Sequence, residues 1–170
     1  MAQARIEQEF SCSEETFWGK VFFHPEYNRR LFFEELEFLG YRVVEYEETP
    51  ERILRVQEIT PKVSGVPGPI AALIGDGFSY LERGVFTRAT RRFEIHVTPS
   101  KLSSKIQFDG VYYTEPLGPH RCRRIFDCTV VCKIFGVGGL LEKQILGDTA
   151  RDYARSAVFT NRFVAELGLE

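Results

Sequence analysis

The densest group of metal-ligating side chains in the sequence comprises His120, Cys122, Cys128 and Cys132. Histidine and thiolate ligands at short spacings are typical of zinc sites. The alternation around them indicates a strand, however, and at roughly 3.4 Å per residue Cys128 and Cys132 would stand about 13 Å apart, too far for one tetrahedral ion. The three cysteines also share even parity with apolar neighbours, Phe126, Val130 and Ile134. We therefore predict no metal site and interpret the cysteines as core or cavity wall.

A glycine-rich segment, Gly136-Val137-Gly138-Gly139, follows a strand-like run and precedes a helical pattern. It lacks the third glycine and the parallel βαβ context of a dinucleotide-binding loop. No Gly-x-Ser-x-Gly motif of a hydrolase is present. His24, His96 and His120 fall in a helix start, a strand and a turn, and the alternation around His96 places it toward water. We predict no catalytic residue and no cofactor.

Charged residues on otherwise apolar strand faces are the more informative candidates. Glu82, Arg91 and Arg124 each share strand parity with aromatic residues, and Arg55 shares it with two isoleucines. A charge on an inward face must be paired or lie near an opening. An inward arginine could bind a ligand carboxylate or phosphate through two hydrogen bonds. We predict Glu82, Arg91 and Arg124 as polar anchors. The alternative is that each lies at a strand end or pairs internally, as Glu82 and Arg91 could.

These residues need a scaffold, and the hydrophobic period of the chain predicts one. Alternation predicts strands over residues 4–10, 41–48, 52–60, 78–87, 91–98, 105–114 and 121–135. Ser11 or Ser13, the latter followed by acidic residues, predicts a helix start, and His24-Pro25-Glu26 starts a second short helix that ends before Gly40. After Gly139 the period becomes helical over 140–167. One face of this helix carries Leu141, Ile145, Tyr153, Ala157, Thr160, Val164 and Leu167.

The inward parity of the strands and of the long helix defines a set of predicted interior residues. They are Tyr80, Phe93, Ile95, Phe108, Tyr112, Phe126, Cys128 and Val130 from the strands, and Tyr153 and Ala157 from the helix. Small alanines opposite large aromatic side chains could leave room for a ligand, or the aromatic side chains could fill the core. The pattern alone does not decide between these alternatives.

Composition limits the class of protein and its partners. The chain has 170 residues, 15 of them Phe, a net charge of −2 and a pI near 6. No global basic field attracts nucleic acid, so we predict no nucleic-acid partner. No apolar run is long enough to cross a bilayer, and no signal peptide begins the chain, so we predict a cytoplasmic protein without an integral membrane segment.

Two sequence segments carry a resemblance to a known superfamily. They are Val66-Pro67-Gly68-Pro69 with the strand Tyr80-Leu81-Glu82-Arg83, and the run Lys133-Ile134-Phe135-Gly136-Val137-Gly138-Gly139-Leu140-Leu141-Glu142-Lys143. With the order of elements, they resemble the START-like superfamily, also called the polyketide-cyclase, Bet v 1 or SRPBCC group. The similarity is to a bacterial branch of that superfamily known as a domain of unknown function.

The resemblance implies a fold and a function class. The implied fold is α+β, a helix-grip domain over residues 1–170, in which a strongly curved antiparallel sheet of about seven strands wraps a long C-terminal helix. It implies a cavity that binds a hydrophobic small molecule, lipid-like or aromatic, and favours a binder over an enzyme. Segment 66–75 would act as a gate, through Pro67, Ile70 and Leu73. The alternatives are a cyclase or aromatase, and an interaction domain with a filled core.

Overall fold

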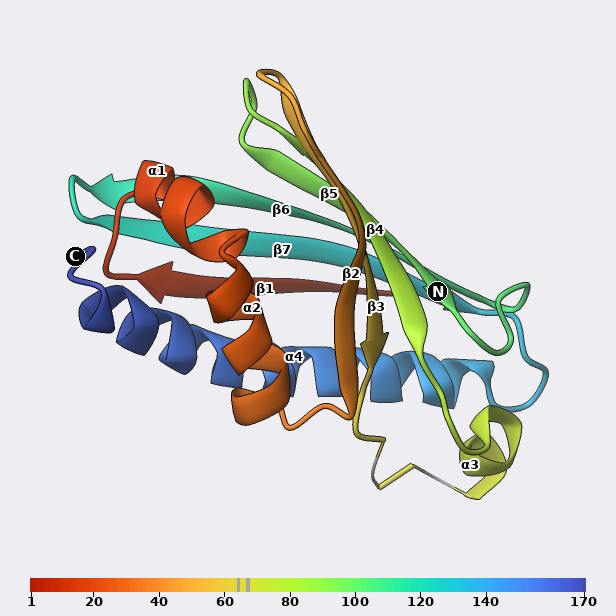
Figure 1. The fold of residues 1–170 in the computed structure, drawn as a ribbon. Coiled ribbons are helices and arrows are strands. Elements are labelled where there is room, and N and C mark those ends of the chain that lie inside the picture. The colour runs from red at the N-terminus through yellow and green to blue at the C-terminus, as the bar shows by residue number, and fades with distance from the viewer. Residues whose placement is uncertain (64, 67) are drawn as a thin grey trace.

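The computed structural model describes residues 1–63, 65–66 and 68–170, and within them one antiparallel sheet bends over one long helix (Figure 1). The sheet has seven strands in the order β1-β7-β6-β5-β4-β3-β2. The strands are β1 (Ala2–Phe10), β2 (Gly40–Glu48), β3 (Arg52–Thr60), β4 (Tyr80–Thr87), β5 (Arg92–Pro99), β6 (Ile106–Gly118) and β7 (Arg121–Cys132). From β3 onward every strand pairs with its predecessor, and β1 closes the other edge against β7. The α+β helix-grip prediction is confirmed.

Two short helical segments follow β1, as the sequence predicted. Helix α1 (Glu14–Thr16) continues as a π-helical turn, Phe17–Phe22, and α2 (Pro25–Arg30) continues as a second one, Leu31–Glu35. Ser13 is the N-cap of α1, and its hydroxyl oxygen accepts the Thr16 N–H at 3.1 Å. His24 caps α2 in the same way, through Nδ1 and the Glu26 N–H.

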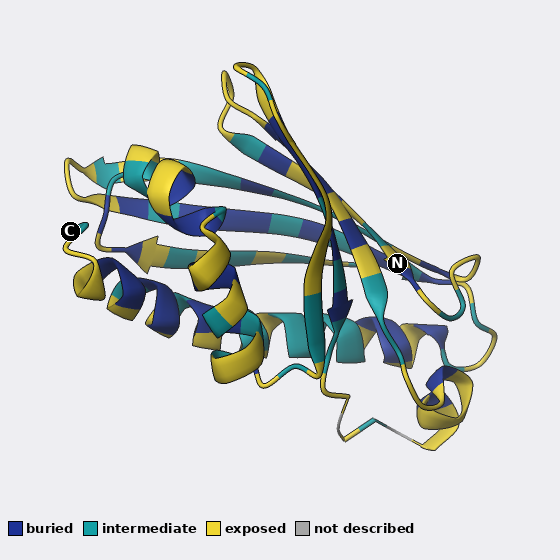
Figure 2. Ribbon diagram, viewed as in Figure 1, coloured by how far each residue is buried: buried dark blue, intermediate teal, exposed yellow. Residues whose placement is uncertain are grey.

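The long helix α4 (Gly138–Glu166) runs beneath the sheet and packs on β1 and β7 (Figure 1). It begins and ends within two residues of the predicted range. Leu167 lies beyond its C-terminal end and is exposed, so the prediction that Leu167 belongs to the buried stripe was wrong. In Figure 2 the buried residues of α4 lie toward its two ends, whereas its middle is partly buried or exposed.

The predicted parity of β7 agrees with its burial. Cys122, Arg124, Phe126, Cys128, Val130 and Cys132 are all buried, and the residues between them, except Ile125, are partly exposed. All four cysteines of the chain are buried with free thiols. The interior position of Cys122, Cys128 and Cys132 is thus confirmed.

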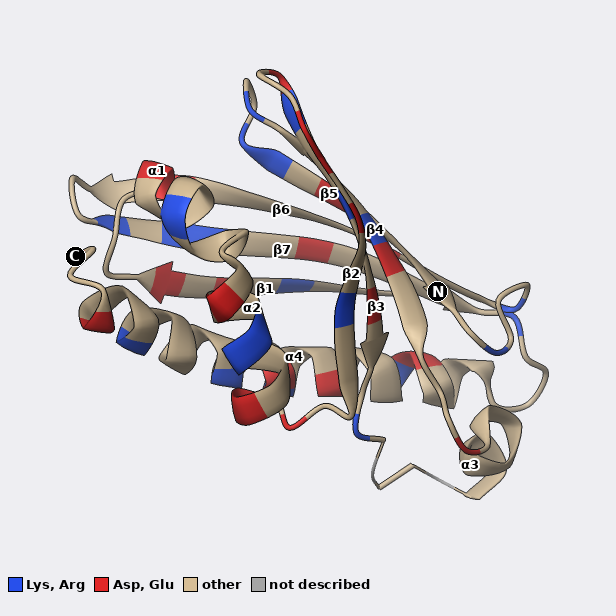
Figure 3. Ribbon diagram, viewed as in Figure 1, with Lys and Arg blue, Asp and Glu red and all other residues tan. Residues whose placement is uncertain are grey.

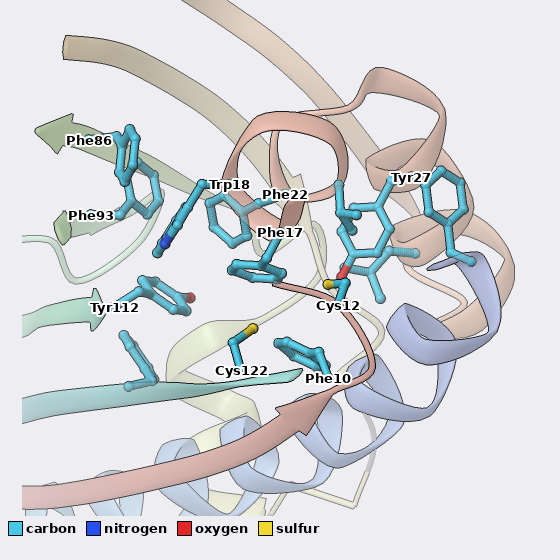
Figure 4. Packing of buried hydrophobic residues seen from close by; sticks show 14 of the residues in the cluster. Phe10, Cys12, Phe17, Trp18, Phe22, Tyr27, Phe86, Phe93, Tyr112 and Cys122 are labelled. Atoms are coloured by element: carbon cyan, nitrogen blue, oxygen red, sulfur yellow. The ribbon is translucent and has the colours of Figure 1, made fainter. Parts of the chain in front are cut away.

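One end of the sheet is closed by aromatic side chains from the first helices. Figure 4 shows this cluster, in which Phe17 stacks on Phe10 with ring centroids 4.9 Å apart and Trp18 stacks on Phe86 at 4.6 Å. The Trp18 indole N–H donates to the Thr114 hydroxyl at 3.0 Å, which satisfies its one polar group. Burial of so many rings supplies a large share of the folding free energy.

Two glycines on the inner face of the sheet receive aromatic rings. A Cβ on Gly84 would lie 2.1 Å from the Phe93 ring, and a Cβ on Gly110 would lie 2.4 Å from the Phe126 ring. Only glycine permits such close approach to a strand backbone. Phe93 and Phe126 therefore lie over the sheet, with other rings packed on them.

Helix α3 (Gly68–Ile74) lies at the opposite end, beside the start of α4 (Figure 1). Its Ile70 and Ile74 belong to a second apolar cluster with residues of β6, β7 and α4, namely Ile106, Val130, Cys132 and Leu141. Within the described ranges, no helix is long and apolar enough to span a membrane.

Candidate ligand-binding cavity

A cavity of about 530 Å³ lies between the sheet, α4 and the short helices. Phe22, Leu31, Phe32 and Leu36 form one wall, and Ile59, Phe78, Val97, Ile106 and Phe108 form another. The middle of α4 closes it with a more polar face, formed by Gln144, Asp148, Thr149, Asp152 and Ser156. A cavity of this volume accommodates a small organic ligand.

Strands β3 and β4 place three polar side chains at the inner wall. Arg55, Gln57 and Glu82 line the cavity and are each buried. Gln57 Nε2 donates to Glu82 Oε1 at 2.9 Å, and Arg55 Nη2 lies 3.8 Å from the same oxygen. The register brings them together because Gln57 pairs with Glu82 and Arg55 pairs with Gly84, two residues along.

The described residues satisfy only part of the hydrogen-bonding capacity of Arg55 and Gln57. Arg55 Nε and Nη1 and Gln57 Oε1 are buried without a hydrogen-bond partner there. The Arg55 guanidinium instead lies over the rings of Phe22, Phe23 and Phe93, 5.1 to 5.4 Å from their centroids. Cation–π attraction offsets part of its desolvation.

Glu82 has a perturbed acidity. Burial raises the pKa of the Glu82 carboxyl, while the nearby Arg55 charge and the Gln57 hydrogen bond oppose the shift. Burial likewise raises the pKa of Tyr80, which lines the cavity on the same strand, and the Glu82 charge adds to the shift. A carboxyl that retains its proton can donate a hydrogen bond or a proton to a bound molecule.

Arg124 of β7 supplies a second buried cation. Its guanidinium lies 5.1 Å from the Phe10 and Tyr153 ring centroids and donates to Gln8 Oε1 through Nη2. Burial lowers the pKa of Arg124, which records the free-energy cost of an interior charge. Its Nε has no hydrogen-bond partner among the described residues.

The predicted interior residues divide into two sets. Tyr80, Phe108, Tyr112 and Tyr153 line the cavity, as do the predicted anchors Glu82 and Arg124. A second set lies outside the lining, although most of its members are buried in the two apolar clusters: Phe93, Ile95, Phe126, Cys128, Val130 and Ala157. Phe93 and Phe126 are kept behind the wall because they lie over Gly84 and Gly110.

Arg91 is placed differently from the prediction. It precedes β5 in a left-handed turn, with φ of 51°, so strand parity does not apply to it. Its guanidinium is exposed and pairs with Glu14 at 3.2 Å, away from the cavity. The suggested pair between Glu82 and Arg91 is therefore wrong, and Glu82 pairs with Arg55.

The three predicted gate residues differ in where they lie. Ile70 is fully buried in the second apolar cluster and Leu73 is exposed, and neither lines the cavity. Pro67 lies outside the described residues. Ile74 and Val66, from the same segment, do line it.

Sequence reasoning missed part of the polar group. Arg55 stood out on an apolar face but was not among the anchors, and Gln57 was not singled out, although both follow the parity of the buried Ile53 and Ile59. The polar residues of α4 that line the cavity were missed because the inward face of this helix was assigned mainly from its apolar residues. Among the described residues, no three His, Cys, Asp or Glu side chains are grouped to hold a metal ion.

Solved structures with the same architecture come from distinct protein classes. The ZhuI aromatase/cyclase from Streptomyces sp. R1128 has a TM-score of 0.67 at 9% identity, over 96% of this chain and 93% of its own. Norcoclaurine synthase from Thalictrum flavum has 0.67 at 15%, over 97% and 87%. A START superfamily protein from Mycobacterium smegmatis has 0.58 at 12%, over 95% and 98%. These likenesses show the START-like fold.

The sequence comparisons identify the family. No curated protein matches the sequence significantly. One family model matches residues 5–164, which is nearly the whole chain, and its description is a protein of unknown function (DUF2505). The fold and this match agree with the START-like superfamily that the sequence resembles. The chain belongs to the DUF2505 family.

Proposed function

We propose that this protein binds a hydrophobic small molecule, lipid-like or aromatic, whose polar end lies against Arg55, Glu82 and Arg124. The observation that carries the proposal is the cavity of about 530 Å³ with largely apolar walls and a buried polar group at its inner wall. Transfer of each CH₂ group from water would contribute about 0.8 kcal/mol to binding. The polar group would fix the orientation of the ligand.

The charges of the inner group favour an acidic or phenolic oxygen on the ligand. The buried charged side chains of the cavity lining are two guanidinium groups, Arg55 and Arg124, and one carboxyl, Glu82. Burial raises the pKa of the Glu82 carboxyl, which weakens its compensation of the positive charges. An anionic or electron-rich group on the ligand would offset the remaining positive charge of Arg55 and Arg124.

Native mass spectrometry of freshly purified protein tests the proposal directly. We expect a copurified small molecule, or a complex after delipidated protein is mixed with fatty acids, sterols or aromatic carboxylic acids. The same panel should raise the thermal stability of the delipidated protein. Absence of any adduct and of any thermal shift across the panel would contradict the proposal.

A pair of adjacent substitutions on α4 separates binding in the cavity from binding elsewhere. Thr149 lines the cavity, so Thr149→Phe should fill part of it and remove the thermal shift. Ala150 is exposed on the same helix, so Ala150→Phe adds the same ring outside the cavity and should leave the shift intact.

Acid–base catalysis on the bound molecule is a second candidate function, favoured by the position and raised pKa of Glu82. Glu82 and Tyr80 share one face of β4, so both could contact a reacting group. Any compound found by mass spectrometry would be incubated with the protein and with Glu82→Gln. A change in its mass or isomeric form that depends on Glu82 would support this candidate, and an unchanged compound would contradict it.

A further inference from the structure

The lysines of this chain are distributed unevenly. The sequence has six, and five of them lie on three segments at the end of the molecule that holds α3, with Lys20 as the exception. Lys62 lies on the segment before α3, Lys101 and Lys105 on the β5–β6 turn, and Lys133 and Lys143 around the start of α4 (Figure 3). We call residues 61–63, 65–66, 68–79, 99–106 and 132–143 the α3 end.

Among the described residues, the lysines take no part in ion pairs. Most arginines form ion pairs, whereas no lysine has an ion-pair partner in the described part of the chain. The α3 end holds five lysines and two acids, Asp76 and Glu142, so its net charge is +3 although the whole chain carries −2. Glu142 is buried and pairs with the N-terminal ammonium group.

Exposed apolar side chains occupy the same end. Phe135 is fully exposed in the loop before α4, and Leu73, Leu140 and Val63 are also exposed. Helix α3 contains no charged residue, and Ala71, Ala72 and Leu73 are exposed on it. Exposed apolar groups that lie together on a surface indicate an interaction site.

Packing and hydrogen bonds connect the segments that carry these groups. The second apolar cluster joins α3, β6, β7 and α4 beneath them. The Lys133 N–H donates to the Lys105 carbonyl oxygen at 2.7 Å, and the Lys101 ammonium donates to the Asp76 carbonyl oxygen, which ties the β5–β6 turn to both neighbouring segments. The apolar and cationic groups are thus presented together.

We propose that the α3 end docks on the surface of an anionic phospholipid bilayer. Phe135, Leu73 and Leu140 enter the interfacial region, and the five lysines contact anionic headgroups. Apolar insertion combined with basic charge is the pattern by which proteins bind membranes peripherally. A second copy of this chain is a poor occupant, because two such ends would bring like charges together.

The docking site is adjacent to the cavity but independent of it. Lys62, Val63, Ile74 and Leu141 belong to the α3 end and also line the cavity, so a docked molecule turns that wall of the cavity toward the bilayer. A hydrophobic ligand would exchange there without crossing water. The docking proposal holds for protein with an empty cavity, so it does not rest on the proposed function.

Vesicle flotation with the delipidated full chain tests the proposal. We expect binding to phosphatidylcholine vesicles that contain about 30% phosphatidylglycerol, weak binding to pure phosphatidylcholine, and release at about 0.5 M salt, where charge attraction is screened. Equal binding to both vesicle types, or binding to neither, would overturn the proposal. So would a monomer–dimer equilibrium without vesicles that Phe135→Ser abolishes, because it would assign the surface to a second copy.

Matched variants assign the binding to this end. Each Lys→Gln change at the α3 end should weaken binding about fivefold, so Lys105→Gln/Lys133→Gln should weaken it about 25-fold while Lys20→Gln has no effect. Phe135→Ser should weaken it about tenfold or more, whereas Val158→Ser, at an exposed valine on the C-terminal half of α4, should not. All five side chains are exposed, so folding is preserved, and circular dichroism checks it. The assignment would be refuted if Lys20→Gln weakened binding as much as Lys105→Gln/Lys133→Gln, or if Val158→Ser weakened it as much as Phe135→Ser.

Discussion

The same sheet and helix enclose a packed aromatic core at one end and a cavity at the other. At the core end, Phe159 stacks on Tyr27 with centroids 5.4 Å apart, and the Tyr27 hydroxyl donates to Thr160 at 2.7 Å. At the cavity end, α4 presents Asp148, Asp152 and other polar residues together with one ring, Tyr153. The first helices supply the aromatic side chains that fill the core end. Around the cavity, rings such as Phe22 and Phe32 line the walls and leave a space between the sheet and the middle of α4.

A large effect should come from truncation of one phenylalanine in each region. Phe159→Ala should lower the free energy of unfolding by about 3–5 kcal/mol, since it removes a fully buried ring from a packed cluster. Phe108→Ala should cost less than half of that, because Phe108 already borders empty space. Urea denaturation of both variants measures the difference, and equal losses would show that the two ends are packed alike.

Close packing over the sheet should also be sensitive to one added methyl group. Gly84→Ala should destabilise the protein by about 1–3 kcal/mol or more, because its Cβ would overlap the Phe93 ring. Phe93→Leu should recover part of the loss in the double variant, by making room. If the losses of the two single variants simply add in the double variant, the strain does not arise from the contact between residue 84 and the Phe93 ring.

The cavity end should be distinguished by its response to pH. Burial raises the pKa of Glu82, so the folded state binds an extra proton between the ordinary carboxyl pKa and the raised one, and stability falls as pH rises through that window. Glu82→Gln removes this dependence. Its destabilisation relative to the wild type should be largest near pH 4 and should shrink by about 1.4 kcal/mol for each unit of the shift as pH rises. Denaturation at several pH values measures this, and a gap that widens with pH would contradict it.

How much of this could be predicted from sequence depends on the kind of feature. Strand parity placed Glu82, Arg124 and the cysteines on the inner face, because side chains alternate strictly along a strand. Parity predicts which face of the sheet a side chain lies on, but it does not predict whether that side chain reaches the cavity or stays packed against the sheet. Phe93 and Phe108 both face inward, yet Phe93 lies over Gly84, whereas Phe108 borders the cavity. Curvature and cross-strand neighbours decide depth, and both arise only when the chain folds.

The lysine cluster illustrates a second limit. Its members are spread from Lys62 to Lys143, so no local run in the sequence reveals them. The overall charge of −2 correctly indicated no global basic field but concealed a local one. Arg91 was predicted to face inward because it shares the parity of Phe93 and Ile95. The left-handed backbone conformation at Arg91 interrupts the alternation before β5 begins, so the prediction was wrong.

The smallest expected effect comes from the helix that spans both ends. Gly147 lies inside α4 with no neighbouring atom within 4 Å of an added Cβ, and its backbone needs no left-handed conformation. Gly147→Ala should therefore stabilise the protein by up to about 1 kcal/mol, since alanine loses less backbone entropy in a helix. Gly84→Ala, the same change at a crowded site, is its control. A loss of stability or of ligand binding in Gly147→Ala would mean that another molecule or segment approaches α4 at this point, beside the cavity rather than beside the core.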